Sequence, residues 1–449
     1  MEEKMKKLLV IACISSLFLL GLTGTSGANV TISIWDEFSA PPTRNAADAT
    51  YQAFQKAHPE VNIAVAHFEN TPYEWVLKAA FAAGEAPNII EVNNGADLFE
   101  KVRAEVIVDI TDFVRERLDR IVVNPSIYAL GGKYWGVPNS AADFGNLIWH
   151  NVLTLKKNGI SVDSLHTWAG FTAACEKLKN QGITPIAFGD KEGWPGNHWW
   201  THLLFRLLGE EKYNELNLRS MIPGWKTELK YTDPAAVKAW ELYSELSEKG
   251  YFSPGAVVDD FSAAATYFLT GRAGFIQNGS WFVGTIRYQK PDFPVDYTWF
   301  PSVEGYPGKY GGVITGGQSY AITTNNTPET KEAALKFLDW LMTKDEANRI
   351  WVEVAQLPPA YRTSLAGFKV DPFLKRMIEE AARAPEAAPY SDVLIDFDIA
   401  VEHTWIASQG ILTGDLTPQE AAERLEKAVQ DWEKEHPEKE TLLSPSLRG

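Results

Sequence analysis

The chain has 449 residues, of which 45% are hydrophobic and 22% charged, which is the composition of a globular protein too long for one core. It excludes fibrous and disordered proteins and predicts two or three domains. The 42 basic and 58 acidic residues leave a formal net charge of −16, which repels phosphate backbones, so we expect no nucleic-acid partner. The 16 Trp residues exceed the needs of a core and predict a use at the surface as well.

Residues 1–28 have the pattern of a secretory signal peptide. Three lysines precede an apolar run from Leu8 to Leu22, and small residues follow up to Ala28. The run is about 15 residues long, shorter than the roughly 20 that a membrane-spanning helix needs. We therefore expect cleavage after Ala28 and export to the periplasm or the cell exterior, without a lipid anchor.

The two cysteines cannot form an internal disulfide after export. Cys13 would leave with the signal peptide, so Cys175 would remain alone. Cys175 lies with Phe171 and Leu178 on the apolar face of a predicted helix, which favours a buried, inert thiol over a nucleophile.

Residues 30–92 alternate between strand and helix patterns. The pattern predicts strands at 30–35, 61–65 and 88–92, with helices ending at 57 and 83 between them. This β-α-β-α-β order predicts a parallel sheet with right-handed crossovers. Because ligands of such sheets bind at the carboxyl ends of the strands, the loops that begin at Asp36 and Asn93 are the first candidate binding loops.

The following residues predict a second α/β unit and a return to the first. A turn-rich strand at 131–138 marks the crossing, and a strand at 147–149 opens the second unit. Helices are predicted at 165–180, at 199–208 and after an Asp233 cap. Strands at 297–300 and 312–322 and a helix capped by Thr327 lead back. The last hundred residues are helical and include a capping box at Thr417–Glu420. Three Trp residues on helices are assigned to the core: Trp240, Trp340 and Trp432.

No motif in the chain specifies catalysis. A glycosidase needs two carboxylates about 5 to 9.5 Å apart, and no pair stands out among the acidic residues at loop and strand ends. The sequence has no nucleophile elbow, Walker loop or dinucleotide fingerprint. The carboxylates available for such a pair are Asp36, Glu37, Glu91, Asp143 and Asp190.

His198 and His202 are one helical turn apart, as in a zinc-binding pair. Trp199, however, stands where metalloproteases have a Glu, and the sequence offers no third ligand. We therefore expect no metal and no other cofactor, and we interpret His198 as a residue of a ligand cleft.

Aromatic and polar residues recur together where predicted strands end. A sugar ring stacks its C–H faces on an indole, while its hydroxyls need charged or amide partners. This combination predicts a carbohydrate ligand. It occurs at Trp35, Asp36 and Glu37, at Asn93 and Asn94, at Asp190, Trp194 and His198, and at Asn278 to Trp281.

Seven short motifs in order along the chain resemble those of the extracellular solute-binding proteins of bacterial ABC transporters, in the sugar- and oligosaccharide-binding branch. The resemblance covers nearly the whole mature chain. The motifs are Ile34-Trp35, FQKAHP at 54–59, AGEAPN at 83–88, GKYWGVP at 132–138, GITPI at 182–186, TGRAG at 270–274 with NGSW at 278–281, and ALKFL at 334–338.

The resemblance implies a two-lobed α/β fold, the periplasmic-binding-protein or Venus flytrap fold. Each lobe is expected to be a mainly parallel sheet flanked by helices, with hinge segments between the lobes and the sugar bound in the cleft. Lobe 1 is expected at 29–138 plus about 311–355, and lobe 2 at 139–310 plus about 356–449. The implied ligand contacts are Trp35, Glu37, Asn93, Asn94, Asn139, Trp194, Trp281, Gly317 and Gln318.

The function implied by the resemblance is that of a monomeric receptor, not an enzyme, which delivers a sugar or oligosaccharide to the transmembrane permease subunits of an ABC transporter. Two alternatives stay open. One is a secreted glycoside hydrolase, and the other is a receptor for another small polar solute. An acidic chain without an evident Arg cluster argues against an anionic ligand.

Overall fold

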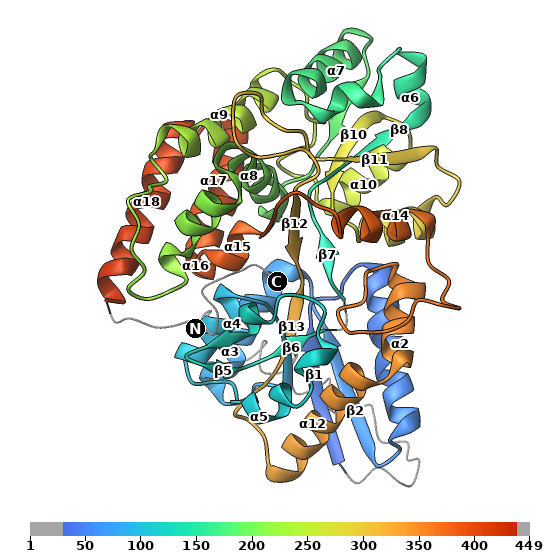
Figure 1. Ribbon diagram of the computed structural model, residues 1–449, viewed down its shortest axis with the longest axis vertical. Coiled ribbons are helices and arrows are strands. Elements are labelled where there is room, and N and C mark those ends of the chain that lie inside the picture. The colour runs from blue at the N-terminus through green and yellow to red at the C-terminus, as the bar shows by residue number, and fades with distance from the viewer. Residues whose placement is uncertain (1–29, 140, 438–449) are drawn as a thin grey trace, which may run out of the picture.

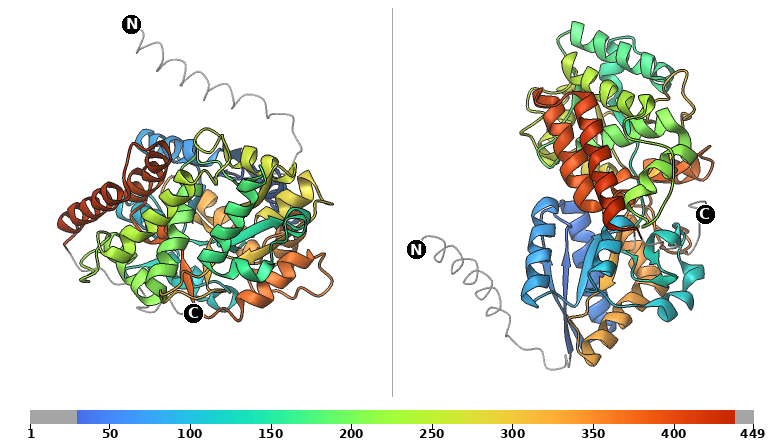
Figure 2. Two further views of the ribbon diagram at one scale, coloured as in Figure 1. Left: turned by 90° about the horizontal axis from the view of Figure 1, so that it is seen from above. Right: turned by 90° about the vertical axis from the view of Figure 1, so that its left-hand side faces the viewer.

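The computed structural model describes residues 30–139 and 141–437, which form two lobes along the longest axis of the molecule (Figures 1 and 2). The predicted signal peptide, residues 1–28, and Cys13 lie outside the described residues. The two-lobed α/β architecture expected from the sequence is confirmed, and a small three-stranded sheet lies between the two larger ones.

Lobe 1 is built on a five-stranded sheet in the order β2-β1-β3-β13-β6. As predicted, β1 pairs in parallel with both β2 and β3, while β13 and β6 run antiparallel to their neighbours. The alternation along β1 buries Ile32 and Ile34 completely. The strands are β1 (Val30–Asp36), β2 (Val61–His67), β3 (Ile89–Asn93), β6 (Val137–Pro138) and β13 (Gln318–Ile322), and β4 (Ala129–Leu130) and β5 (Lys133–Tyr134) form a separate pair.

Helices flank the sheet of lobe 1 on both sides (Figure 1). Phe54 of α2 is fully buried and meets Phe337 of α12 edge to face, with ring centroids 5.2 Å apart. Thr327 caps α12 as predicted. The helices of lobe 1 are α2 (Pro41–Ala57), α3 (Asn70–Ala83), α4 (Ala96–Arg103), α5 (Thr111–Arg115), α12 (Pro328–Thr343) and α13 (Asp345–Ile350).

Lobe 2 has a four-stranded sheet in the order β11-β8-β10-β9, with β10 and β9 as its parallel pair. The expectation of a mainly parallel sheet is wrong here, because β8 is antiparallel to both of its neighbours. The reason is topological: β8 carries the chain away from the hinge, whereas β9, β10 and β11 each run back toward it. The strands are β8 (Leu147–Asn151), β9 (Thr184–Ala187), β10 (Ala273–Asn278) and β11 (Val295–Trp299).

The helices of lobe 2 differ in two details from the predicted ones. The helix expected at 199–208 begins earlier, at Trp194, and bends at Gly209, where φ is 71°. Asp233 does precede its helix, but its carboxylate accepts the backbone N–H of Lys230 (2.9 Å) and no N–H of the helix. The helices are α6 (Val152–Lys157), α7 (Trp168–Asn180), α8 (Trp194–Asn217), α9 (Pro234–Glu248), α10 (Phe261–Leu269) and α11 (Phe282–Gln289).

The strand predicted at 312–322 is divided into β12 (Val313–Gly316) and β13 at Gly317. Gly317 has a φ of +137°, which side chains other than that of glycine rarely allow, and this turn sends the two strands into different sheets. β12 lies in the sheet between the lobes, where it pairs with β7 (Asp143–Phe144) and β14 (Ala387–Pro389). The chain therefore crosses between the lobes at Gly317.

The C-terminal residues form helices that pack mainly on lobe 2 (Figure 1). The capping box predicted at Thr417 is present at the start of α18, and Trp240, Trp340 and Trp432 are buried as predicted. Cys175 is fully buried, as predicted, and burial raises the pKa of its thiol. The helices are α14 (Pro372–Ala381), α15 (Ser391–Leu394), α16 (Phe397–Ala400), α17 (Ile406–Thr413) and α18 (Pro418–Glu435). Among the described residues, no helix has the length and apolarity needed to span a membrane.

Thr417→Ala is expected to destabilise α18. The Thr417 hydroxyl accepts the backbone N–H of Glu420 (3.2 Å), and the Glu420 carboxylate accepts the backbone N–H of Thr417 (2.9 Å). Losing the hydroxyl should lower the free energy of unfolding by about 1 kcal/mol, measured by thermal unfolding. Thr417→Ser keeps the cap and is the control. Equal melting temperatures for the Ala and Ser variants would contradict this account.

Candidate ligand-binding site between the lobes

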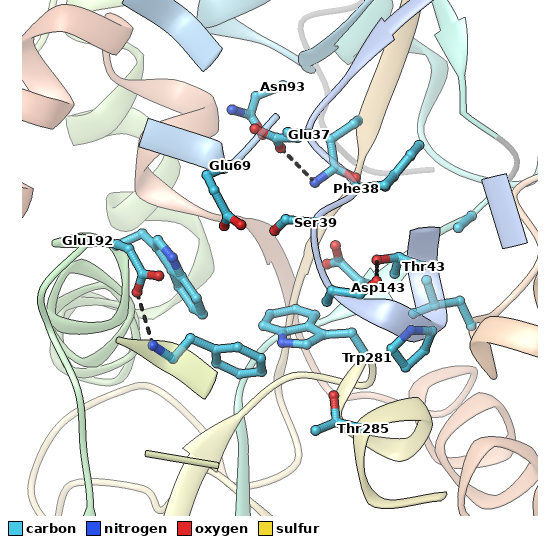
Figure 3. A pocket seen from close by; sticks show the side chains of 18 of the residues that line it. Glu37, Phe38, Ser39, Thr43, Glu69, Asn93, Asp143, Glu192, Trp281 and Thr285 are labelled. Atoms are coloured by element: carbon cyan, nitrogen blue, oxygen red, sulfur yellow. Dashed lines mark hydrogen bonds between the residues drawn. The ribbon is translucent and has the colours of Figure 1, made fainter. Parts of the chain in front are cut away.

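A cavity of about 680 Å³ lies between the two lobes and is within the size range of small-molecule sites. Figure 3 shows its lining side chains, which come from the ends of lobe-1 strands on one side and from helices and turns of lobe 2 on the other. Eight predicted site residues line it: Glu37, Asn93, Asn139, Trp194, His198, Trp281, Gly317 and Gln318.

A closed ring of hydrogen bonds forms part of the lobe-1 wall. Glu91 of β3 accepts the backbone N–H of Glu37 (2.9 Å) and the Nδ2 of Asn139 (2.9 Å). The Nδ2 of Asn139 also donates to the Oε1 of Gln318 (3.2 Å), and the Nε2 of Gln318 donates to Glu37 (3.4 Å). Since each polar group has a partner, the ring holds the Glu37 carboxylate and the Gln318 amide in fixed orientations.

Carboxylates in this wall hold protons more tightly than free carboxylates do. Burial, followed by repulsion from Glu74 and Asp97, raises the pKa of Glu37 to about 8. Burial and the neighbouring Glu37 raise the pKa of Glu91 well above its usual range. Near neutral pH the Glu37 carboxyl can therefore donate a hydrogen bond as well as accept one.

The lobe-2 wall is aromatic. Trp194, at the start of α8, and Trp281 meet edge to face with centroids 6.3 Å apart, and both are partly exposed. His198, one turn further along α8, stacks on Tyr390 at 4.3 Å. At Gly279 an added Cβ would lie 2.0 Å from the Trp281 ring, so only glycine lets this indole fold over its own turn. The wall therefore offers aromatic faces and edges to a ligand.

Three polar atoms at the cavity are buried and make no hydrogen bond within the described residues. They are the Nδ1 of His198, the hydroxyl of Tyr390 and the Oδ1 of Asp143. Burial lowers the pKa of His198 to about 3, so its ring is neutral at physiological pH. Buried polar atoms without partners are costly, and a polar ligand would relieve that cost.

Four predicted site residues do not line the cavity. Trp35 packs on Phe68, with ring centroids 5.2 Å apart. Asp36 is fully buried, accepts the hydroxyl of Tyr51 (2.7 Å) and lies 2.6 Å from the Nδ1 of His67, so it joins β1 to its neighbours.

The other two residues are also fully buried. The Nδ2 of Asn94 lies 3.4 Å from the hydroxyl of Tyr128. Asp190 accepts the hydroxyl of Ser408 (2.7 Å) and the backbone N–H of Gly196 (2.6 Å), which anchors the first turn of α8. These side chains support the wall from behind.

The two histidines one helical turn apart, His198 and His202, lie in different environments. His202 is buried, with its Nε2 3.1 Å from the Nε2 of Gln277, while His198 lies at the cavity. Within residues 30–139 and 141–437, no group of three His, Cys, Asp or Glu side chains could hold a metal ion.

Sequence reasoning missed several lining residues. Tyr390 and Asp392 come from a stretch with short elements and no clear hydrophobic period, and their chain position alone gives no signal of a site. Glu192 directly follows Lys191 in the loop after β9, where the position of Asp190 could have suggested it.

Comparison with known proteins relates the chain to one family. A family model of bacterial extracellular solute-binding proteins matches residues 49–376. The chain is 25% identical over 359 residues to an uncharacterized ABC transporter extracellular-binding protein of Pyrococcus horikoshii, covering 78% of this chain and 76% of that one. It is 23% identical over 313 residues to the multiple sugar-binding protein of Streptococcus mutans, covering 69% and 70%.

A solved structure of a chitin oligosaccharide binding protein has the same fold. It superimposes with a TM-score of 0.80 at 24% sequence identity, and the match covers 91% of this chain and 100% of the other.

Asp143→Asn is expected to stabilise the protein without ligand at alkaline pH. Burial, with a smaller contribution from Asp392, raises the pKa of Asp143 from 3.8 to about 7. The folded protein thus binds this proton more tightly than the unfolded chain does. The protonated Asp143 therefore contributes its full stabilisation of the folded state below pH 3.8, and this contribution is lost as the pH rises to about 7.

Since Asn cannot ionise, the melting temperature of the variant relative to the unmodified protein should rise between pH 4.5 and pH 8, by an amount equivalent to on the order of 1 kcal/mol. Asp292→Asn, at an exposed position of lobe 2, is the control for losing one charge. A difference in melting temperature that is independent of pH would contradict the burial argument.

Proposed function

The chain belongs to the family of bacterial extracellular solute-binding proteins, and we propose that it captures a sugar or oligosaccharide between its lobes and delivers it to the permease of an ABC transporter. The observation that carries the proposal is the pairing of two unlike walls around one cavity. One wall presents fixed carboxyl and amide groups, and the other presents Trp194 and Trp281.

The two walls match the two kinds of surface that a sugar ring presents. Indoles suit the apolar C–H faces of a pyranose, while hydroxyl groups in the ring plane need donors and acceptors. The names of two similar proteins, a multiple sugar-binding protein and a chitin oligosaccharide binding protein, support this ligand class. We take as ligand contacts the eight predicted residues that line the cavity.

We propose that the protein is a receptor and not an enzyme. The family and its solved neighbour are binding proteins. Glu37 and Glu91 have raised pKa values, as a glycosidase acid would, but the Glu91 carboxylate is engaged by Asn139 and by the backbone of Glu37. This engagement suits a supporting role better than proton transfer to a leaving group.

The proposal takes residues 29–138 with about 311–355 as one moving body, and 139–310 with about 356–449 as the other. The segments that would bend are those on either side of Gly317 and β7. We further propose export by a signal peptide cleaved after Ala28, a periplasmic or extracellular location without a lipid anchor, and a monomeric state.

Trp281→Ala should weaken sugar binding by on the order of 1 to 3 kcal/mol, or about 5- to 150-fold, by analogy with base stacking on aromatic side chains. Titration calorimetry with a sugar selected by thermal shift measures the change. Trp75→Ala is the matched control, because Trp75 lies on α3 with 67% of its surface exposed and does not line the cavity. Unchanged affinity in the Trp281 variant would exclude Trp281 as a stacking surface.

The receptor function predicts that the ligand is returned unchanged. An oligosaccharide that binds should raise the melting temperature. At 100 times its Kd it should raise the free energy of unfolding by about 2.7 kcal/mol. After incubation, chromatography should recover it intact, and small-angle scattering should show a smaller radius of gyration with ligand. Cleavage of a ligand, abolished by Glu37→Gln, would identify a hydrolase and overturn the proposal.

A further inference from the structure

Six carboxyl groups line the cavity. Among the described residues, Lys191 is the only lysine or arginine that lines it, and its side chain is exposed. Hydroxyl groups of a neutral sugar do not require so many carboxyl groups. Burial raises the pKa of Glu37 to about 8 and of Asp143 to about 7, so both bind protons near neutral pH, and a cation beside them would favour their charged forms. The six are Glu37, Glu69, Asp143, Glu192, Asp260 and Asp392.

Two of the carboxylates face each other from opposite lobes. Glu69 precedes α3 of lobe 1, and Glu192 precedes α8 of lobe 2, and Figure 3 shows both beside the same space. Burial contributes most to the raised pKa of Glu192, and the negative charges of Asp260 and Glu69 raise this pKa further. Glu69 is therefore close enough to repel Glu192. The backbone N–H of Phe261 donates to Glu192 (3.1 Å), and this bond and the adjacent Lys191 act on the pKa of Glu192 in the opposite sense.

A second pair lies near the sheet between the lobes. Asp143 of β7 and Asp392 of α15 repel each other, and burial raises the pKa of Asp392 to about 6. The Nδ2 of Asn197 donates to Asp392 (3.0 Å). The Oδ1 of Asp143 is buried without a hydrogen-bond partner in the described residues.

Unpartnered side chains mark the same pair as part of a binding site. Tyr390 is 4% exposed and His198 is 8% exposed, and the Tyr390 hydroxyl and the His198 Nδ1 have no hydrogen-bond partner in the described part of the chain. Tyr390 is close enough to Asp143 and Asp392 for both carboxylates to raise the pKa of its hydroxyl, after burial. Polar groups without partners thus surround the two carboxylates.

A bound metal ion does not account for the carboxylates of the cavity. Residues 30–139 and 141–437 contain no group of three His, Cys, Asp or Glu side chains able to hold a metal ion. The carboxylates are instead distributed over both walls, as expected for a ligand that carries its charge at more than one position. An ammonium group has three donors for such acceptors and also binds favourably over indole faces such as those of Trp194 and Trp281.

We propose that the ligand is a cationic carbohydrate, an amino sugar or its oligosaccharide with free, protonated amines, and that the cavity discriminates against acidic sugars. This inference rests on the proposed sugar-binding function and adds the charge of the ligand to it. The amines pair with the carboxylates of the two facing pairs, while the ring hydroxyls bind the amide groups of the lobe-1 wall.

The test compares four β-1,4-linked disaccharides by titration calorimetry at pH 6.5, where an amine is protonated: those of glucosamine, N-acetylglucosamine, glucose, and glucose with a uronic acid. The glucosamine disaccharide should bind at least about 10-fold more tightly than the neutral ones, since each amine gains charge-assisted hydrogen bonds. This preference should shrink at 0.5 M salt. The uronate should bind most weakly.

Glu192→Gln and Asp143→Asn should each reduce the ratio of the affinities for the glucosamine and the neutral disaccharides by about 10-fold. Two variants are used because Asp143 lies in a hinge strand and Glu192 does not. Asp292→Asn removes an exposed charge from lobe 2 outside the cavity and should leave the preference unchanged.

The outcomes separate the two proposals. Equal or tighter binding of the neutral disaccharides, or an unchanged preference in both variants, would overturn the inference and leave sugar binding intact. If no sugar in the panel or in a wider thermal-shift screen binds, and spermidine does, the proposed sugar-binding function fails as well.

Discussion

The buried carboxylate of Glu91 is the interaction on which the lobe-1 wall depends. Glu91 lies on β3, in the middle of the sheet, and burying an unpaired carboxylate there would be very costly. The backbone of Glu37 and the side chain of Asn139 satisfy both of its oxygens, and these partners come from the ends of β1 and β6. The hydrogen bonds to the Glu91 carboxylate thus hold the ends of β1 and β6 in place and position Glu37 and Asn139 at the cavity.

The two walls obtain their rigidity from different sources. The lobe-1 wall is held by hydrogen bonds among polar side chains, so its donors and acceptors have set directions. The lobe-2 wall is held by ring contacts and by glycines that leave room for rings: a Cβ at Gly145 would lie 1.4 Å from the Tyr390 hydroxyl oxygen. Aromatic packing tolerates small shifts better than a hydrogen-bond ring does. In the proposed function, lobe 1 would therefore specify the pattern of hydroxyl groups, and lobe 2 would contribute adaptable apolar area.

Sequence reasoning succeeded where a period or a local rule decides the structure. The β-α-β-α-β order, the cap at Thr327, the capping box at Thr417 and the buried Trp240 each follow from residues within a few positions of one another. It could not give strand direction in lobe 2, because the direction of β8 depends on where the chain crosses the hinge, more than a hundred residues from the strand that returns it.

At the site, the limit was the orientation of single side chains. Trp35, Asp36 and Glu37 are consecutive, and only Glu37 lines the cavity. Trp35 packs on Phe68 and Asp36 is buried against Tyr51, whereas Glu37 follows the end of β1, where the strand's alternation no longer predicts the direction of a side chain. Asp392 was missed for another reason. It reaches the cavity from a four-residue helix, in a region without the hydrophobic periodicity that would predict a buried face.

The distribution of charge would also connect ligand binding to the proposed closure of the lobes. Glu69 and Glu192 belong to different lobes, so their repulsion opposes closure, and the exposed Lys191 beside Glu192 offsets part of it. The ion pair of Lys78 on α3 with Asp398 on α16 (2.6 Å) acts in the opposite sense, but Asp398 is 60% exposed, and exposed pairs contribute little. A ligand shifts a two-state equilibrium only by its differential affinity for the two states. A cation placed between Glu69 and Glu192 has that differential affinity, because it meets both carboxylates only when the lobes are together. Charge on the ligand would then increase closure as well as affinity.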